Sequence, residues 1–181
     1  MSDVLFSIVI PTYNREKFIV RTIQSLLSQT YTKFEIIVVD DGSTDNTEKV
    51  VREIEDQRIQ YHQKENGERG AARNYGTNKA KGKYINFFDS DDLAYMNHLS
   101  EAMEMLHKFN TPEVFHLGYD IKNSEGRTLK RKNLVTDINI SLAHGNCLSC
   151  NGVFVRLDIV KKHPFSTIRA LSASEDYLLW L

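Results

Sequence analysis

Cysteine is scarce in this 181-residue sequence, which contains only Cys147 and Cys150. They form one isolated C-x-x-C pair, whereas a structural zinc site needs four ligands, and no thioredoxin-like pattern surrounds them. We therefore expect two reduced, small core residues in place of a redox or metal site.

The sequence also lacks an excess of charge and any long apolar run. Lysine and arginine number 23 against 24 aspartates and glutamates, so the formal net charge is −1. This balance gives no global electrostatic reason to expect a nucleic-acid partner. No apolar run approaches the roughly 20 residues that span a bilayer, and the first residues lack the basic head and apolar core of a signal peptide. We expect a cytoplasmic protein.

Two glycine signatures of nucleotide-binding proteins are missing as well. Neither G-x-G-x-x-G nor G-x-x-x-x-G-K-[ST] follows the first apolar stretch of the chain, residues 6–10. These signatures bring the backbone close to phosphates in Rossmann dehydrogenases and P-loop enzymes. Their absence disfavours both classes of enzyme.

What the sequence does contain is a regular alternation of strand and helix patterns, within a length that fits one domain. Such alternation predicts an α/β fold with a doubly wound, mostly parallel sheet and right-handed connections. Asn14 is expected to cap the first helix, Asp45 and Glu48 to form a capping box for the second, and Gly82 to close the third. The strands are expected at residues 6–10, 34–39, 58–62 and 84–88, and the helices after residue 14, after residue 45 and at 71–80.

The pattern changes beyond residue 92. We expect a core helix over 96–109, a strand over 114–121 that turns at 123–126 into a hairpin, a strand over 153–155 and a short helix over 157–162. The basic run 130–132 is expected to be a solvated face, with a phosphate contact as the alternative. Residues 173–181 look like the start of a helix without a closing cap, so we expect the chain to be a fragment of a longer protein.

Polar clusters follow three of the predicted strands, at residues 11–14, 40–45 and 89–92. Because parallel strands end at one edge of a sheet, where open α/β sheets bind ligands, we expect these clusters to form one site. Asp89, Asp91 and Asp92 would repel one another unless they shared a cation, and such oxygen ligands suit Mg²⁺ or Mn²⁺. The alternative for the two aspartate clusters, 40–45 and 89–92, is a solvated turn with helix-capping aspartates.

Five short motifs follow one another along the chain. They are S-I-V-I-P-T-Y-N at 7–14, V-V-D-D-G-S-T-D at 38–45, G-A-A-R-N-Y-G at 70–76, F-D-S-D-D at 88–92 and E-D at 175–176. In this order they resemble the motifs of the family 2 inverting glycosyltransferases, which have the GT-A fold. The resemblance is strong up to Asp92 and looser after it. It implies a Rossmann-like nucleotide-sugar-binding half, residues 1–92, and a smaller acceptor-binding half of the same domain, residues 93–181.

The resemblance implies roles for individual residues on the donor side. Pro11, Thr12 and Tyr13 would border the nucleobase, and Asp41 would accept a hydrogen bond from the uracil N–H of a UDP-sugar. Arg73 would face the uracil or the diphosphate, with an ordinary ion pair as its alternative. Asp89 and Ser90 would lie by the ribose, and Asp91 would hold a divalent Mn²⁺ or Mg²⁺ ion that bridges the phosphates.

On the acceptor side, inversion requires a carboxylate base opposite the leaving diphosphate, and the resemblance assigns this role to Asp176. A dipole-favoured acid at a helix N-terminus is the alternative for Asp176. The resemblance also implies a saccharide or glycolipid acceptor and a location peripheral to the inner face of the membrane.

Two other classes of protein compete with this interpretation. A receiver domain would carry its paired acids after the first strand, whereas here they follow the second. A catalytically silent nucleotide-sugar-binding module would keep Asp41 and Asp89, so the motifs do not separate it from an enzyme.

Overall fold

A computed structural model describes residues 5–133, 137–168, 170 and 176. Its centre is a six-stranded sheet with the strand order β3-β2-β1-β4-β8-β5, in which the first four strands of the chain run parallel and β8 is antiparallel to both of its neighbours. The mostly parallel sheet agrees with the sequence prediction. The strands are β1 (Phe6–Thr12), β2 (Phe34–Asp40), β3 (Ile59–Gln63), β4 (Tyr84–Phe87), β5 (Val114–His116) and β8 (Val153–Arg156).

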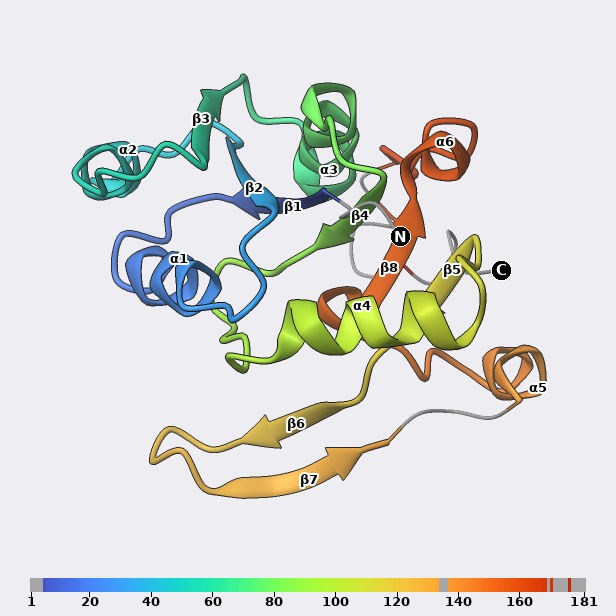
Figure 1. The fold of residues 1–181 in the computed structure, drawn as a ribbon. Coiled ribbons are helices and arrows are strands. Elements are labelled where there is room, and N and C mark those ends of the chain that lie inside the picture. The colour runs from blue at the N-terminus through green and yellow to red at the C-terminus, as the bar shows by residue number, and fades with distance from the viewer. Residues whose placement is uncertain (1–4, 134–136, 169, 171–175, 177–181) are drawn as a thin grey trace.

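Helices cover both faces of this sheet (Figure 1). The side chains of β1 are apolar on both faces of the sheet. Ile8 and Ile10 belong to the apolar cluster under α1, α2 and α4, whereas Val9 belongs to the cluster under α3, α5 and α6. Burial on both faces explains the continuous apolar runs in the sequence. The helices are α1 (Ile19–Leu27), α2 (Thr47–Arg52), α3 (Glu68–Lys79), α4 (His98–Lys108), α5 (Ile138–Ala143) and α6 (Leu157–Val160), and a 3-10 turn spans Cys150–Gly152.

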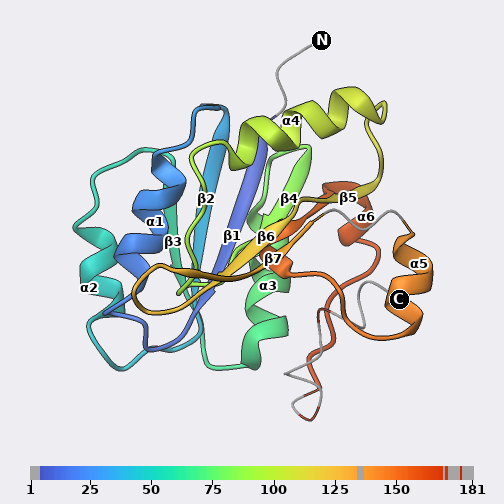
Figure 2. The same ribbon diagram turned by 90° about the horizontal axis from the view of Figure 1, so that it is seen from below.

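A two-stranded hairpin lies apart from the main sheet, beyond α1 and α4 (Figures 1 and 2). It consists of β6 (Tyr119–Lys122) and β7 (Thr128–Lys132), and the predicted turn at 123–126 joins them. The prediction of one strand over 114–121 was wrong. β5 ends at His116, the Leu117 backbone N–H makes a last hydrogen bond to the Gly152 carbonyl at 2.8 Å, and the separate strand β6 starts at Tyr119.

Two predicted helix ends were also wrong. Asn14 does not cap α1, because it has a φ of 51° and its side chain accepts from the Thr44 N–H at 2.8 Å. Gly82 does not close α3 in the left-handed conformation. Its N–H donates to Ser7 Oγ at 2.8 Å, and a Cβ at residue 82 would lie 2.7 Å from the Leu5 carbonyl oxygen. Glycine is required there because the chain passes directly against β1.

The capping box predicted for α2 was wrong, because the N-cap position is Asn46 and no side chain caps the helix there. Asp45 Oδ1 accepts from the Thr47 N–H at 3.0 Å just before the helix, and the Glu48 carboxylate pairs with Arg52 Nε at 2.8 Å. Both cysteines are free, with Cys150 buried and Cys147 partly buried in the core, as expected. Within the described ranges, no helix is both long enough and apolar enough to cross a membrane. Of the helix predicted over 173–181, all but Asp176 lies outside the described residues.

Candidate functional site

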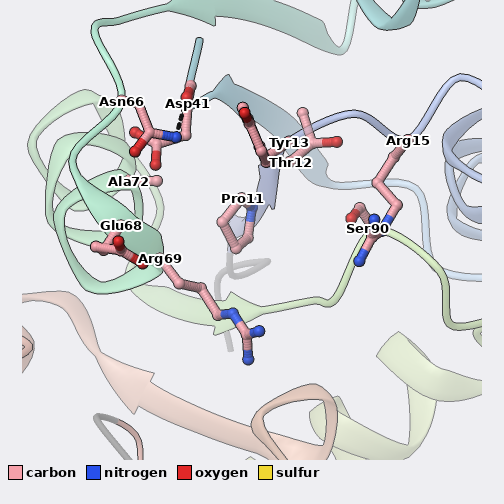
Figure 3. Close-up of a pocket in the computed structure, with 10 residues that line it drawn as sticks. All are labelled: Pro11, Thr12, Tyr13, Arg15, Asp41, Asn66, Glu68, Arg69, Ala72 and Ser90. Carbon is pink, nitrogen blue, oxygen red and sulfur yellow. Dashed lines mark hydrogen bonds between the residues drawn. The ribbon is translucent and has the colours of Figure 1, made fainter. Parts of the chain in front are cut away.

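The loops that follow β1, β2 and β4 meet at one edge of the sheet, around a pocket of about 370 Å³ (Figure 3). Parallel strands have their carboxyl ends at the same edge of a sheet. The structure confirms the prediction that the polar clusters after these strands lie close together. The pocket is lined by Pro11, Thr12, Tyr13, Arg15, Asp41, Asn66, Glu68, Arg69, Ala72 and Ser90.

Side chains near the loop that follows β2 form hydrogen bonds with the backbone of the loop that follows β1. The Asn14 N–H donates to Ser43 Oγ at 2.9 Å, and the Arg15 N–H donates to Thr47 Oγ1 at 2.8 Å. The Asp41 N–H donates to the Thr12 carbonyl at 2.9 Å. The two motifs therefore support each other's backbone, although about thirty residues of chain separate them.

The paired aspartates after β2 have different surroundings. Asp40 is fully buried, accepts from the Ser43 N–H at 2.7 Å and accepts from the Tyr61 hydroxyl at 2.5 Å. Burial, together with the hydrogen bond to Asp40, raises the pKa of Tyr61 well above its ordinary value. Asp40 thus shapes the turn, which matches the alternative considered for this cluster.

Asp41, in contrast, lines the pocket. Its Oδ1 accepts from Lys64 Nζ at 2.5 Å and from the Gly67 N–H at 3.0 Å, while Asn66 Nδ2 donates to the Asp41 carbonyl at 2.9 Å. The Lys64 ammonium and the Gly67 N–H orient this carboxylate, and Asn66 holds the backbone that carries it. Neither Lys64 nor Asn66 was predicted as a site residue. The signal that could have pointed to this part of the chain is the glycine-bearing loop at residues 66–70.

Arg73 is almost completely buried and pairs with the Asp89 carboxylate, with an Nη2 to Oδ1 distance of 3.1 Å. Its guanidinium also lies over the Phe165 ring at 5.2 Å from the ring centre. Burial of an arginine is costly unless it is paired, and both contacts reduce that cost. Arg73 and Asp89 are therefore brought together beside the pocket rather than among the residues that line it.

The other acids of the 89–92 loop, Asp91 and Asp92, are both exposed residues, although the Asp92 carboxyl is partly shielded from water. The Asp91 side chain is 48% exposed, and its Oδ2 lies 3.6 Å from Arg15 Nε. Asp92 accepts a hydrogen bond from Asn151 Nδ2. Burial raises the pKa of Asp92 from its ordinary value, opposed by the Asn151 bond and assisted by the charges of Asp89 and Asp91.

A divalent ion fits the donors that this loop presents. Among the described residues, no group of three or more His, Cys, Asp or Glu side chains could hold a metal ion. Mg²⁺ and Mn²⁺ nevertheless bind through one or two carboxylates together with waters and substrate phosphates. Asp91 offers exposed carboxylate oxygens of this hard type, with the partly exposed Asp89 next to it.

A buried asparagine ties this acidic loop to the second half of the chain. Asn86 Nδ2 donates to the Asn151 and Val153 carbonyls at 2.9 and 2.8 Å, so its Oδ1 faces His98 Nε2 at 3.3 Å. Burial lowers the pKa of His98 to about 4, so the ring is neutral and its Nε2–H donates to Asn86. Asn151 in turn accepts from the Asp89 N–H at 2.9 Å. The sequence did not reveal this network, because the segment around Asn151 carried no diagnostic pattern.

Asp176 lies outside the set of residues that line the pocket. Asn146 Nδ2 donates to its Oδ2 at 3.2 Å, and the residue is partly buried. Of the predicted site residues, the structure therefore brings five together in the pocket: Pro11, Thr12, Tyr13, Asp41 and Ser90. Arg73, Asp89 and Asp91 lie next to the pocket. Asp176 lies beside Asn146, outside the set of residues that line the pocket.

Sequence reasoning missed several residues that line the pocket. Glu68 begins α3 with a φ of 69°, which is rare for a residue with a side chain and is found most often at functional sites. Thr12 was predicted, and its buried hydroxyl has no hydrogen-bond partner within the described part of the chain. The missed lining residues are Arg15, Asn66, Glu68 and Arg69.

Comparison with known proteins gives a consistent result. Residues 7–154 match the family model for glycosyl transferase family 2. The Escherichia coli protein named UDP-Glc:alpha-D-GlcNAc-diphosphoundecaprenol beta-1,3-glucosyltransferase WfgD is 35% identical over 185 residues, which cover all of this chain and 70% of WfgD. An uncharacterized glycosyltransferase of Rickettsia conorii is 34% identical over 187 residues, which cover 97% of this chain and 30% of that protein.

Among solved structures, S. aureus TarS 1–349 in complex with UDP is similar, with a TM-score of 0.76 and 29% sequence identity over 97% of this chain and 53% of that chain. The same TarS fragment in complex with UDP-GlcNAc has a TM-score of 0.74 at 28% identity. This chain therefore spans about half of the TarS fragment and about a third of the Rickettsia conorii relative. On the family match and these relatives, the chain belongs to glycosyl transferase family 2 and has the GT-A fold.

Proposed function

We propose that the protein transfers a sugar from a UDP-sugar donor to an acceptor hydroxyl, with inversion at the anomeric carbon and dependence on Mn²⁺ or Mg²⁺. The observation that carries this proposal is the convergence of Pro11, Tyr13, Asp41 and Ser90 on one pocket at the carboxyl edge of the sheet. The UDP complex of TarS, a structural relative at 29% identity, supports UDP as the nucleotide.

The pocket has the features that recognition of a uracil ring requires. The Tyr13 ring is 47% exposed beside Pro11 and offers an aromatic surface for stacking. Asp41 is a charged acceptor whose orientation is set by Lys64 and the Gly67 N–H, and the uracil ring offers one N–H donor. A carboxylate acceptor discriminates against a base that lacks this donor, because a buried polar group would then remain unpaired.

The acidic loop would serve the diphosphate. Asp91, with Asp89 beside it, would hold the divalent ion, which when bound supplies positive charge at the departing diphosphate as a Lewis acid. Arg73 holds Asp89 in position from a buried site. Ser90 and Asp89 would contact the ribose.

Asp176 would be the general base that accepts the proton of the attacking acceptor hydroxyl. Asn146 donates to its carboxylate and so orients it. Residues 1–92 would form the donor half and residues 93–181 the acceptor half. By analogy with the name of WfgD, the acceptor would be a lipid-linked saccharide, and the protein would work at the inner face of the membrane.

Isothermal titration of UDP with and without Mn²⁺ tests the donor site. We expect Mn²⁺-dependent binding to the wild type, loss of the metal dependence in Asp91→Ala, and unchanged binding in Glu104→Ala, which removes an exposed carboxylate from α4. Failure of the folded wild type to bind UDP with Mn²⁺ or Mg²⁺ would contradict the donor assignment.

The catalytic proposal needs a separate measurement, because a silent nucleotide-binding module would also bind UDP. In the full-length protein, Asp176→Asn is expected to abolish sugar transfer while UDP affinity stays within about twofold. Equal transfer rates in the wild type and in this variant would remove Asp176 from the mechanism.

A further inference from the structure

Each of the three carboxylates assigned to the donor site lies beside a basic side chain. Lys64 Nζ is 2.5 Å from Asp41, Arg73 Nη2 is 3.1 Å from Asp89, and Arg15 Nε is 3.6 Å from Asp91. The first two cations are 19% and 2% exposed, whereas Arg15 is 40% exposed. The Lys64–Asp41 pair is short and largely buried, and the Arg73–Asp89 pair is short and joins a buried cation to a partly exposed carboxylate, so we expect both pairs to persist. The third is long and exposed, so it is easily exchanged.

The backbone of Arg15, in contrast to its side chain, is held firmly. The Arg15 N–H donates to the buried Thr47 hydroxyl at 2.8 Å, and the Glu16 N–H donates to Asp45 Oδ2 at 3.1 Å. Among the described residues, the guanidinium makes only the 3.6 Å approach to Asp91 and a 3.4 Å hydrogen bond to the Asn14 carbonyl. A fixed Cα with a weakly held guanidinium allows the side chain to reorient without moving the loop.

The position of Arg15 in the pocket indicates which kind of ligand group it can bind. Arg15 lines the pocket together with Ser90, and Arg69 enters from the opposite side, at the start of α3 (Figure 3). A guanidinium presents paired N–H donors whose spacing matches two oxygens of a phosphate group. The pocket therefore presents such a donor directly beside the carboxylate proposed to hold the metal.

We propose that Arg15 is a diphosphate-binding residue that neutralises Asp91 in the nucleotide-free protein and turns to the phosphate oxygens when Asp91 holds the metal ion. The inference rests on the proposed function of the donor site. It predicts effects of opposite sign for one substitution. Removing the charge of Arg15 should strengthen the binding of Mn²⁺ alone and weaken the binding of UDP in the presence of Mn²⁺.

The test compares the wild type, Arg15→Gln and Arg21→Gln, the last of which removes an exposed arginine from α1 outside the pocket. Mn²⁺ binding without nucleotide is measured by electron paramagnetic resonance, and binding of UDP and uridine by calorimetry with Mn²⁺ present. For Arg15→Gln we expect Mn²⁺ affinity to rise about two- to fivefold, as loss of an exposed ion pair allows. We expect UDP affinity to fall about tenfold or more, as loss of a charged hydrogen bond implies, and uridine affinity to stay unchanged.

The remaining outcomes overturn the inference in distinguishable ways. If Arg15→Gln matches Arg21→Gln in both Mn²⁺ and UDP binding, Arg15 binds neither partner. If uridine affinity falls as far as UDP affinity, Arg15 supports the shape of the pocket and does not bind phosphate. If the wild type itself fails to bind UDP, the proposed function fails, and the assignment of Arg15 fails with it.

Discussion

The two halves of the chain are organised by different kinds of contact. In the first half, loops at the ends of β1 and β2 are joined by short side-chain bonds such as Asn14 to Ser43 and Arg15 to Thr47. In the second half, β6 and β7 form an exposed hairpin outside the main sheet, and β5 and β8 extend the sheet. The first half builds a pocket from its own loops, whereas the second half contacts the loop beside that pocket through Asn151, which accepts hydrogen bonds from Asn86 and from the Asp89 N–H.

The largest effect is expected from cutting that connection. Asn86→Ala removes the donors to the Asn151 and Val153 carbonyls and the acceptor for His98, all within the core. Unpaired buried polar groups cost about 1–3 kcal/mol each, so we expect the free energy of unfolding to fall by about 3 kcal/mol in urea titrations. The exposed Asn78→Ala on α3 is the control, expected within about 0.5 kcal/mol of the wild type. A similarly small loss in Asn86→Ala would show that the two halves are held together elsewhere.

The next effect concerns pH. Because burial lowers the pKa of His98 to about 4, below the ordinary value of 6.5, the unfolded chain binds more protons between these values. The contribution of His98 to stability is therefore complete above pH 6.5 and declines as pH falls towards 4, by about 2 kcal/mol at pH 5. Urea titrations at pH 7 and pH 5 should show a smaller loss in His98→Gln than in the wild type. An equal loss would mean that His98 is accessible to protons in the folded protein.

Within the first half, the carboxylate of Asp41 should decide which base is bound. Asp41→Asn keeps an oxygen for the Gly67 N–H but adds an amide donor and removes the charge that pairs with Lys64. We expect the preference for UDP over CDP to fall about tenfold, as the loss of one charge-assisted hydrogen bond implies. Competitive titrations of the two nucleotides measure this ratio, and an unchanged preference would place the base away from Asp41.

The smallest effect is expected in the hairpin. Arg131 donates to both Asp120 oxygens at 2.8 and 3.0 Å from an exposed position, and Tyr95 donates to the same carboxylate at 2.7 Å. In Arg131→Ala we expect faster hydrogen exchange of the β6 amides, with no change in UDP affinity or in the urea midpoint of the whole protein. A weakened UDP affinity would show that the hairpin belongs functionally to the donor site.

The sequence was most informative where a residue's role depends on its immediate neighbours. The strand ends before Asp41 and Asp89 were predictable from apolar runs and polar turns, and so was their meeting at one edge of a parallel sheet. The cations beside Asp41 and Asp91 were not predictable, because Lys64 and Arg15 come from other loops. The break between β5 and β6 was missed for a similar reason, since it lies where the contact of β5 with the distant β8 segment ends.

By itself, the sequence determined the fold class, the order of the strands and helices up to Phe87 and five of the residues that line the pocket, because hydrophobic period and turn chemistry are local properties. Only the tertiary structure decided which carboxylate is buried and which is exposed, and which basic side chain lies beside each carboxylate. Asp40 and Asp41 are adjacent in sequence, yet Tyr61 and Ser43 enclose one and Lys64 orients the other at the pocket. Tyr61 and Lys64 each lie more than twenty residues from the aspartate that they contact, and no local pattern encodes contacts of this kind.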